Sequence, residues 1–229
     1  MIRWGPERAR AGPWRGDRQV AYLSPVADAP VPSAAFVRRC LEQLAQRGYH
    51  RVVTGALSPA ESSGFLAAGF EISEQLHLLA HDLVRIPDAP IGAPVRRAGR
   101  GDHISVLRVD HRAFPPFWRL DPGGLADAVA ATPQSRFRVV DDGEVVAYAI
   151  TGRAGRRGYL QRLAVDPDRG GEGLGSGLVV DGLRWLKRWR VDHAVVNTQL
   201  DNRRALALYE RLGFRRQPLG LSVLSAGLG

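Results

Sequence analysis

Cysteine is almost absent from this chain of 229 residues, since Cys40 is its single one. No disulfide can form within the chain, and zinc sites built from several thiolates are excluded. No apolar run approaches the roughly 18 residues that a membrane-spanning helix needs. The N-terminal residues Met1–Pro6 lack the apolar stretch of a signal peptide. These absences predict a protein of a reduced, cytoplasmic compartment.

Lysine is as scarce as cysteine. Lys187 is the one lysine among 32 basic residues, the others being arginines, and 23 acidic residues leave a formal net charge of +9. A basic surface attracts phosphates, acidic proteins or nucleic acid. The arginines are spread along the chain, so a solvated basic surface explains them better than a nucleic-acid-binding stripe.

The chain is long enough to bury a core, as one large domain or two small ones. Residues 85–102, RIPDAPIGAPVRRAGRGD, are rich in Pro, Gly and Arg and are typical of a linker that leads into a short strand at 95–97. The sequence therefore predicts two parts, residues 1–90 and residues 91–229.

The second part alternates the patterns of strands and helices. Predicted helices cover residues 104–114, 125–131, 174–189 and 202–212, and predicted strands cover residues 137–140, 145–150, 159–165, 194–196 and 219–224. Asp141–Gly143 is a hairpin signal between two of these strands. The expected fold class is α/β, with a mixed sheet.

The first part contains a shorter version of the same ending, with a helix at 36–44, a strand at 52–54 and a helix at 60–68. A constant offset of 144 positions relates the two endings. It aligns Gly69-Phe70 with Gly213-Phe214, Val52 with Val196, Thr54 with Thr198, Ser58 with Asn202, and Phe65 with Tyr209. An internal duplication is the favoured explanation, and chance similarity of two ordinary strand–helix units is the alternative.

The chemistry-bearing stretch runs from a strand at Leu163 through a glycine-rich turn into a helix at Leu174. Glycines let backbone N–H groups approach a ligand closely at the positive end of a helix, where a phosphate or diphosphate binds. The spacing is neither that of a P-loop nor that of a dinucleotide-binding turn. A glycine-rich helix start without a ligand stays the alternative.

A second stretch, Asn202–Phe214, begins with a good N-cap residue. Tyr209 follows Asn202 by seven residues, two helical turns along the same face. A tyrosine in a helix usually fills the core, so the combination with the glycine-rich turn carries the functional interpretation.

Together, a strand ending in L-A-V-x-P, a glycine-rich turn and a later N-x-x-A-x-x-x-Y-E-x-x-G-F resemble the GNAT superfamily of acetyl-coenzyme A-dependent N-acetyltransferases. The resemblance covers residues 95–229 in the order of elements. It implies a mixed, splayed sheet flanked by helices, with acyl-CoA bound between two parallel strands. Acetyl-CoA would be the acyl donor, and no metal is implied.

The resemblance also implies residue roles. Backbone groups of Leu163 and Val165 would pair with the pantetheine arm, as an added strand does. Asn202 would contact the pantetheine or the diphosphate end, and Tyr209 would donate a proton to the leaving thiolate, because a free tyrosine is protonated at neutral pH. The implied coenzyme-binding residues are Leu163, Ala164, Val165, Arg169, Gly170, Gly171, Glu172, Gly173, Leu174, Gly175 and Asn202.

The sequence departs from the family pattern twice. The Arg or Gln that usually precedes the glycines falls on Gly170, while Arg169 lies one position earlier. The strand residue that is often an acidic base has no equivalent near Gln161 and Arg162, which leaves a water relay or a substrate amine that arrives neutral.

Four more residues have side chains that could react or bind a ligand. Asp110 and His111 fall where the acceptor usually faces, but a solvated helix face is the favoured explanation for both. His193 is expected to cap the start of a strand. Cys40 lies outside the motifs.

The first part has Phe65 in place of Tyr209 and Ser58 in place of Asn202, and Asp28–Ser33 replace the glycine-rich turn. We therefore expect residues 1–90 to form a degenerate half that binds no acyl-CoA and packs on the active domain or walls the acceptor site.

The acceptor is the least determined part. Pro115 and Pro116 stiffen the segment 113–120, and Phe117 and Trp118 provide either an apolar wall or core filling. Acidic residues are not clustered there, which favours a peptide N-terminus or a small amine with an apolar or anionic part. The sequence thus predicts an N-acetyltransferase acting on a primary amine in a ternary complex. A non-catalytic acyl-CoA-binding or protein-interaction module is the alternative, nucleic acid and membrane partners are disfavoured, and a homodimer is open.

Overall fold

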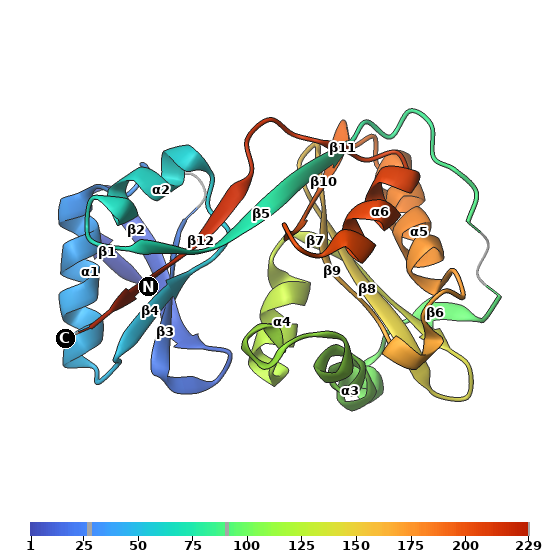
Figure 1. Cartoon of the computed structure of the whole chain (residues 1–229), viewed down its shortest axis with the longest axis horizontal. Helices are drawn as coiled ribbons and strands as arrows, with labels where there is room; N and C mark the ends of the chain where they lie inside the picture. Colours follow the sequence, from blue (N-terminus) through green and yellow to red (C-terminus); the bar gives the residue numbers. More distant parts are fainter. Residues whose placement is uncertain (27–28, 90–91, 229) are drawn as a thin grey trace. The chain divides into compact units, whose positions relative to one another are not determined.

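A computed structural model describes residues 1–26, 29–89 and 92–228 of the chain (Figure 1). Contacts between residues divide the chain into two compact units. The first unit comprises Met1–Leu78, Asn197–Asp201 and the C-terminal segment from Gln217, and the second comprises Leu79–Val196 and Asn202–Arg216. In the described ranges, no helix is long and apolar enough to cross a membrane.

The first unit is a mixed sheet with two helices. Its strands lie in the order β1-β2-β3-β4-β12-β5, with a parallel pairing between β3 and β4 and antiparallel pairings elsewhere. The elements are β1 (Ile2–Trp4), β2 (Glu7–Trp14), β3 (Asp17–Pro25), α1 (Ala34–Gln46), β4 (Arg51–Thr54), α2 (Pro59–Leu66), most of β5 (Glu71–His81) and β12 (Leu221–Gly227).

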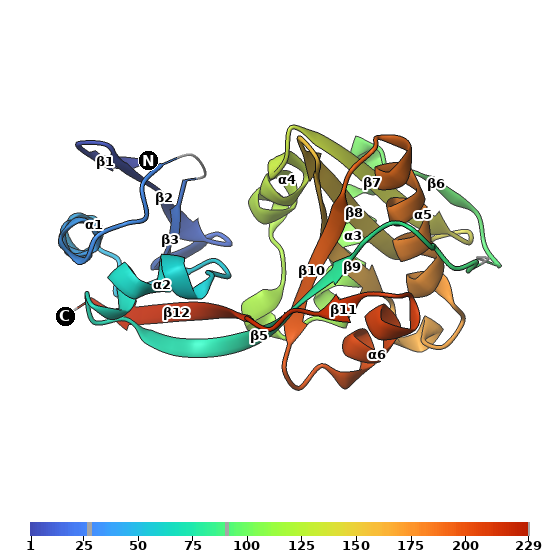
Figure 2. The ribbon, with the colours of Figure 1, turned by 90° about the horizontal axis from the view of Figure 1, so that it is seen from above.

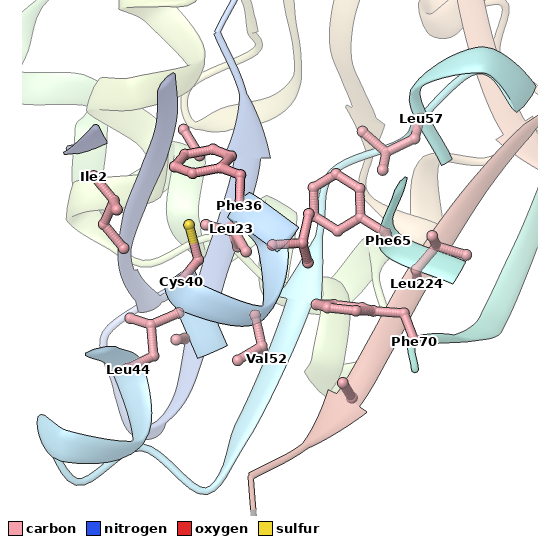
Figure 3. Packing of buried hydrophobic residues seen from close by; sticks show 14 residues of the cluster. Ile2, Leu23, Phe36, Cys40, Leu44, Val52, Leu57, Phe65, Phe70 and Leu224 are labelled. Atoms are coloured by element: carbon pink, nitrogen blue, oxygen red, sulfur yellow. The ribbon is translucent and has the colours of Figure 1, made fainter. Parts of the chain in front are cut away.

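Side chains of both helices meet the sheet in one core (Figure 3). Phe36, Cys40 and Leu44 recur on one face of α1, the spacing of an amphipathic helix. The Cys40 thiol lies among them, and burial raises its pKa to about 12. The thiol is therefore protonated at neutral pH and is excluded as a nucleophile.

The second unit is a mixed sheet with helices on both faces. Its strands follow the order β10-β9-β8-β7-β6, in which the β9–β10 pairing is parallel and the others are antiparallel. The elements are β6 (Val95–Arg97), η1 (Arg100–Asp102), α3 (His103–Ala113), η2 (Pro116–Trp118), α4 (Pro122–Ala130), β7 (Gln134–Asp141), β8 (Val145–Ala154), β9 (Arg157–Val165), η3 (Pro167–Arg169), α5 (Leu174–Arg188), most of β10 (His193–Gln199), α6 (Arg203–Arg211) and β11 (Arg215–Arg216), where η marks a short 3-10 helix.

Alternation along the strands separates the two faces of this sheet. Tyr148 and Ile150 of β8 pack with residues of α3 and α4, whereas Ala147 and Ala149 pack with Leu178 of α5. Figures 1 and 2 show α3 and α4 on one side of the strands and α5 and α6 on the other. The mixed α/β fold expected from the sequence is confirmed.

The internal repeat is present in the structure as well as in the sequence. Ser58 and Asn202 are the N-caps of α2 and α6. The backbone N–H of Phe70 bonds to the carbonyl of Phe65 (3.1 Å), as that of Phe214 does to Tyr209 (3.0 Å). A glycine with positive φ precedes each phenylalanine, at +96° and +92°.

The two units interleave along the chain. β12 is the last strand of the chain, yet it lies between β4 and β5 in the sheet of the first unit. The end of β5 pairs with β11 in the second unit. A single cut near residue 90 does not describe these units. The functional division into a structural part (1–90) and a catalytic part (91–229) therefore stays a prediction.

Several elements were missing from the sequence-based expectation. No strands were expected at β1, β2, β3 and β5. The expected linker does contain the short strand β6, and the short 3-10 helix η1 follows it. Of the sequence features discussed above, Asp28 and residues 90 and 91 lie outside the described residues.

Candidate active site

One edge of β9 is paired with a neighbouring strand for only part of its length. β9 pairs with β8 as far as Val165, but its parallel pairing with β10 ends at Tyr159, opposite Val195. Among the described residues, the β9 edge from Leu160 to Val165 therefore pairs with no strand on the β10 side. Such an edge offers backbone N–H and C=O groups to an extended ligand, and Leu163, Ala164 and Val165 lie on it.

A β-bulge lies within this open stretch. Ile150 pairs with Arg162 and Thr151 with Leu160, so Gln161 is the extra residue. The Gln161 amide nitrogen bonds to the Thr132 hydroxyl at 3.1 Å. Bulges re-aim side chains next to functional sites, and this one sets the direction of both Gln161 and Arg162.

The glycine-rich turn joins β9 to α5. Gly171 and Gly173 have φ values of +92° and +80°, which L side chains rarely adopt. Gly173 is the N-cap of α5, so no side chain caps the helix. The N–H groups of the first turn of α5 therefore point toward the turn without an intrahelical partner, at the positive end of the helix dipole. This is a cradle for an anion.

The strand, the turn and α6 meet at Gly175. A Cβ atom built on Gly175 would lie 3.4 Å from Val165 Cγ2, 3.5 Å from Leu208 Cδ2 and 4.0 Å from Leu163 Cδ2. The open edge of β9 and the start of α5 are thus adjacent, and α6 packs against both.

Tyr209 lies on α6 in the same unit. Asn202, the N-cap residue of α6, accepts a hydrogen bond from the N–H of Ala205 at 3.0 Å, which fixes the first turn of this helix. Tyr209 is 5% exposed, and burial raises the pKa of its phenol. The phenol is therefore protonated across the neutral range.

The carboxylates near the turn are already paired with arginines. Arg112 contacts Asp166 at 2.9 Å and Asp168 at 2.6 Å. Arg169 contacts Glu172 at 2.7 Å and Asp142 at 2.9 Å, and the Arg169 guanidinium lowers the pKa of Glu172. The predicted ligands Arg169 and Glu172 thus bond to each other, so a phosphate would have to compete with two carboxylates for Arg169.

Asp110 does not lie on a solvated helix face, contrary to the sequence-based expectation. It is fully buried, because Arg162 of β9 neutralises it with bonds of 2.8 and 2.9 Å. The Leu120 N–H donates to it at 2.8 Å, and the Tyr148 hydroxyl donates to it as well. Its acceptor capacity is used within the protein, so Asp110 is not a free base.

The same arginine fixes the segment between α3 and α4. Arg162 donates to the carbonyl of Trp118 at 2.7 Å and lies 3.5 Å from the centre of the Phe114 ring. His111 adds a contact of 2.7 Å between its Nε2 and the carbonyl of Leu120. The Phe117 side chain is 38% exposed, which favours a wall residue over core filling.

The sequence missed Arg162 as the partner of Asp110, because the two residues are 52 positions apart and neither has a motif. His193 begins β10, where a strand-capping residue was expected.

Comparison with known proteins identifies the family. Residues 105–214 match the model of the acetyltransferase (GNAT) family. A mycothiol acetyltransferase of Amycolatopsis mediterranei is 30% identical over 207 residues, covering 80% of this chain and 67% of the relative. One of Saccharopolyspora erythraea is 29% identical over 223 residues, covering 92% and 71%.

Solved structures agree on the fold. A tandem GNAT protein from the clavulanic acid biosynthesis pathway superposes with a TM-score of 0.66 at 15% identity, covering 92% of this chain and 76% of its own. A GCN5-related N-acetyltransferase from Sphaerobacter thermophilus gives 0.63 at 17% identity, covering 96% and 76%. The chain belongs to the GNAT family of acetyltransferases, with a GNAT-like region preceding the matched domain.

Proposed function

We propose that this acetyltransferase transfers the acetyl group of acetyl-CoA to a primary amine by direct attack in a ternary complex. The observation that carries the proposal is the open edge of β9 beyond Tyr159, which lies beside the uncapped start of α5. A long ligand with an amide-bearing arm and a diphosphate fits these two features in that order.

In this proposal the chain's residues have separate tasks. Backbone groups of Leu163 and Val165 bind the pantetheine arm, and amides between Gly170 and Gly175 bind the diphosphate. The amine forms a C–N bond to the thioester carbonyl, the C–S bond breaks, and the Tyr209 hydroxyl donates its proton to the leaving thiolate. The proton that the attacking nitrogen loses passes to water, and water returns a proton to the phenolate. Because burial raises the pKa of Tyr209, the phenol is protonated at neutral pH before the thiolate leaves.

A general base is not assigned to a side chain. Arg162 stands near the expected place of an acidic base, and Asp110 is bound to it. A water relay, or an amine that arrives neutral, is consistent with this arrangement. The first acceptor to test is the one used by mycothiol acetyltransferases, because the two relatives above bear that name. The cytoplasm is the proposed location, because a chain with one cysteine has no internal disulfide, which is typical of proteins in reducing compartments.

The first unit is proposed to bind no acyl-CoA. The Ser33 N–H at the start of α1 donates to the carboxylate of Glu7 at 2.5 Å, and the Ser33 hydroxyl does so at 3.1 Å. The positive end of this helix thus already holds a negative charge, which would repel a diphosphate. Phe65 also has no proton to donate where Tyr209 has one.

Thioester turnover tests the proposal. Free thiol release from acetyl-CoA would be followed with a panel of amines and peptides that includes the mycothiol acetyltransferase acceptor. We expect turnover by the natural chain, and a kcat about 100-fold lower for Tyr209→Phe, the typical contribution of a general acid. Tyr49→Phe, in the first unit, is the matched control and should leave kcat unchanged.

Two results would contradict parts of this proposal. Tight CoA binding with no turnover of any amine would favour the non-catalytic acyl-CoA-binding module. Full activity of Tyr209→Phe would show that the chain is an acetyltransferase but that the Tyr209 phenol is not its general acid.

A further inference from the structure

Arg204, on the first turn of α6, is a cation beside the glycine-rich turn to which no role has been assigned. A Cβ atom built on Gly170 would lie 2.4 Å from the Arg204 Nη2 and 3.2 Å from its Cζ. The guanidinium therefore lies directly against the backbone of Gly170, although the two residues are 34 positions apart in the chain.

The backbone at position 170 does not itself require glycine. Gly170 has a φ of −70° and a ψ of 137°, which any residue adopts. A side chain there would meet the Arg204 guanidinium, and a Cβ would also approach the Pro167 carbonyl to 3.1 Å. The absence of a side chain at Gly170 thus leaves room for the Arg204 guanidinium at this position.

The ion pairs around the turn single out the same residue. The carboxylates of Asp166 and Asp168 pair with Arg112, and that of Glu172 pairs with Arg169. The Arg204 guanidinium is exposed and pairs with no carboxylate of the described residues. Its positive charge lies against Gly170, in the turn that leads to the uncapped amides at the start of α5, where the partial charges are positive too. A guanidinium and helix-start amides on the same turn suit an anionic ligand.

We infer that Arg204 binds the diphosphate of the acyl-coenzyme A, in place of the loop side chain that Gly170 lacks. The inference rests on the proposed function, which puts that diphosphate at the turn. A guanidinium donates in a planar fork that matches two phosphate oxygens. Backbone amides of the turn and the fork of Arg204 then hold the diphosphate from two elements, α5 and α6.

Calorimetric titration with CoA and with 3′-dephospho-CoA tests this inference. For Arg204→Ala we expect Kd to rise about 10-fold for both ligands, the low end for a charged hydrogen bond lost at an exposed site. Arg203→Ala removes the same charge from the neighbouring exposed position and should change Kd little for either ligand. The loss should also shrink at high salt because the interaction is ionic.

A swap variant separates lost binding from damaged folding. In the double variant Gly170→Arg with Arg204→Ala, the turn regains a guanidinium at the position vacated by Arg204. We expect its CoA affinity to return toward that of the natural chain, with Tm values of all variants alike.

The outcomes are distinct. If the natural chain does not bind CoA, the proposed function fails. If it binds CoA and Arg204→Ala binds equally well, only the inference fails. A loss confined to CoA and absent with 3′-dephospho-CoA would overturn the diphosphate assignment, because the guanidinium would then contact the 3′-phosphate.

Discussion

A single buried imidazole shows how much one side chain depends on its surroundings in this chain. His81 is 1% exposed in the second unit, and its Nδ1 accepts the N–H of Leu83 at 2.9 Å. Its ring lies 5.1 Å from that of Phe214. Burial lowers the pKa of His81, a shift that the nearby Asp82 opposes only in part. The imidazole is therefore neutral in the folded chain at neutral pH.

This lowered pKa predicts how stability depends on pH. In the unfolded chain His81 takes up a proton near pH 6.5, whereas in the folded chain it does so only at lower pH. The unfolded state thus binds more protons below about pH 6.5, and His81 should make the free energy of unfolding fall as the pH falls through that range. Urea unfolding between about pH 5 and 8 measures this slope.

His81→Gln should flatten the slope, and His50→Gln, at a histidine of the first unit, should leave it unchanged. Equal slopes in the natural chain and in His81→Gln would show that the imidazole does not carry the effect.

At the residue scale, the sequence located the positions that a motif marks and missed those that only the fold brings together. The N-caps Ser58 and Asn202 and the pair of Phe65 and Tyr209 follow from local spacing. The contact of Arg204 with Gly170 joins residues on different elements, and no periodicity within one element predicts such a contact.

At the scale of elements, α3, β9 and the segment between α3 and α4 depend on the buried pair of Asp110 and Arg162. Asp110 is fully buried, and the Arg162 side chain is 11% exposed. Removing one partner leaves the other charge desolvated, which costs about 3–5 kcal/mol. Asp110→Ala is therefore expected to lower the free energy of unfolding by about 3 kcal/mol.

Chemical denaturation measures this loss. The control is Glu144→Ala, which breaks an ion pair with Arg108 in which the side chains are 65% and 54% exposed. Solvent screens that pair, so the change should be under about 1 kcal/mol. Equal effects of the two substitutions would contradict a structural role for the buried pair.

The elements also show why sequence prediction succeeded unevenly. Helix α1 has a continuous apolar stripe, and its position was predicted to within two residues. In β2, Ala9 is the one residue of the strand that is fully buried, so the strand has no alternation to detect. β5 begins with exposed residues and buries side chains only from Leu76 onward. The bulge at Gln161 arises from pairing with β8, which one strand's sequence does not encode.

At the scale of the whole molecule, the C-terminal strand belongs to the unit that begins the chain. β12 pairs with β4 and β5, and Leu224 lies in the same core as Phe36 and Phe65 (Figure 3). The repeat predicts two similar halves. Because both halves have the same local pattern, it does not predict that the last strand of the chain joins the sheet of the first half. Folding of the first unit therefore requires that both ends of the chain be present.

This arrangement predicts a long-range effect of one substitution. Leu224 is fully buried, so Leu224→Ala should cost about 2–5 kcal/mol, because apolar packing is removed and a cavity remains. Hydrogen exchange should show weaker protection in α1 and β4, which lie near the other end of the chain, while α5 keeps its protection. Leu219→Ala, at a residue that is 64% exposed, is the control and should leave exchange unchanged. If α5 lost protection and α1 kept it, β12 would belong with the second unit in solution, and the interleaving of the two halves would be wrong.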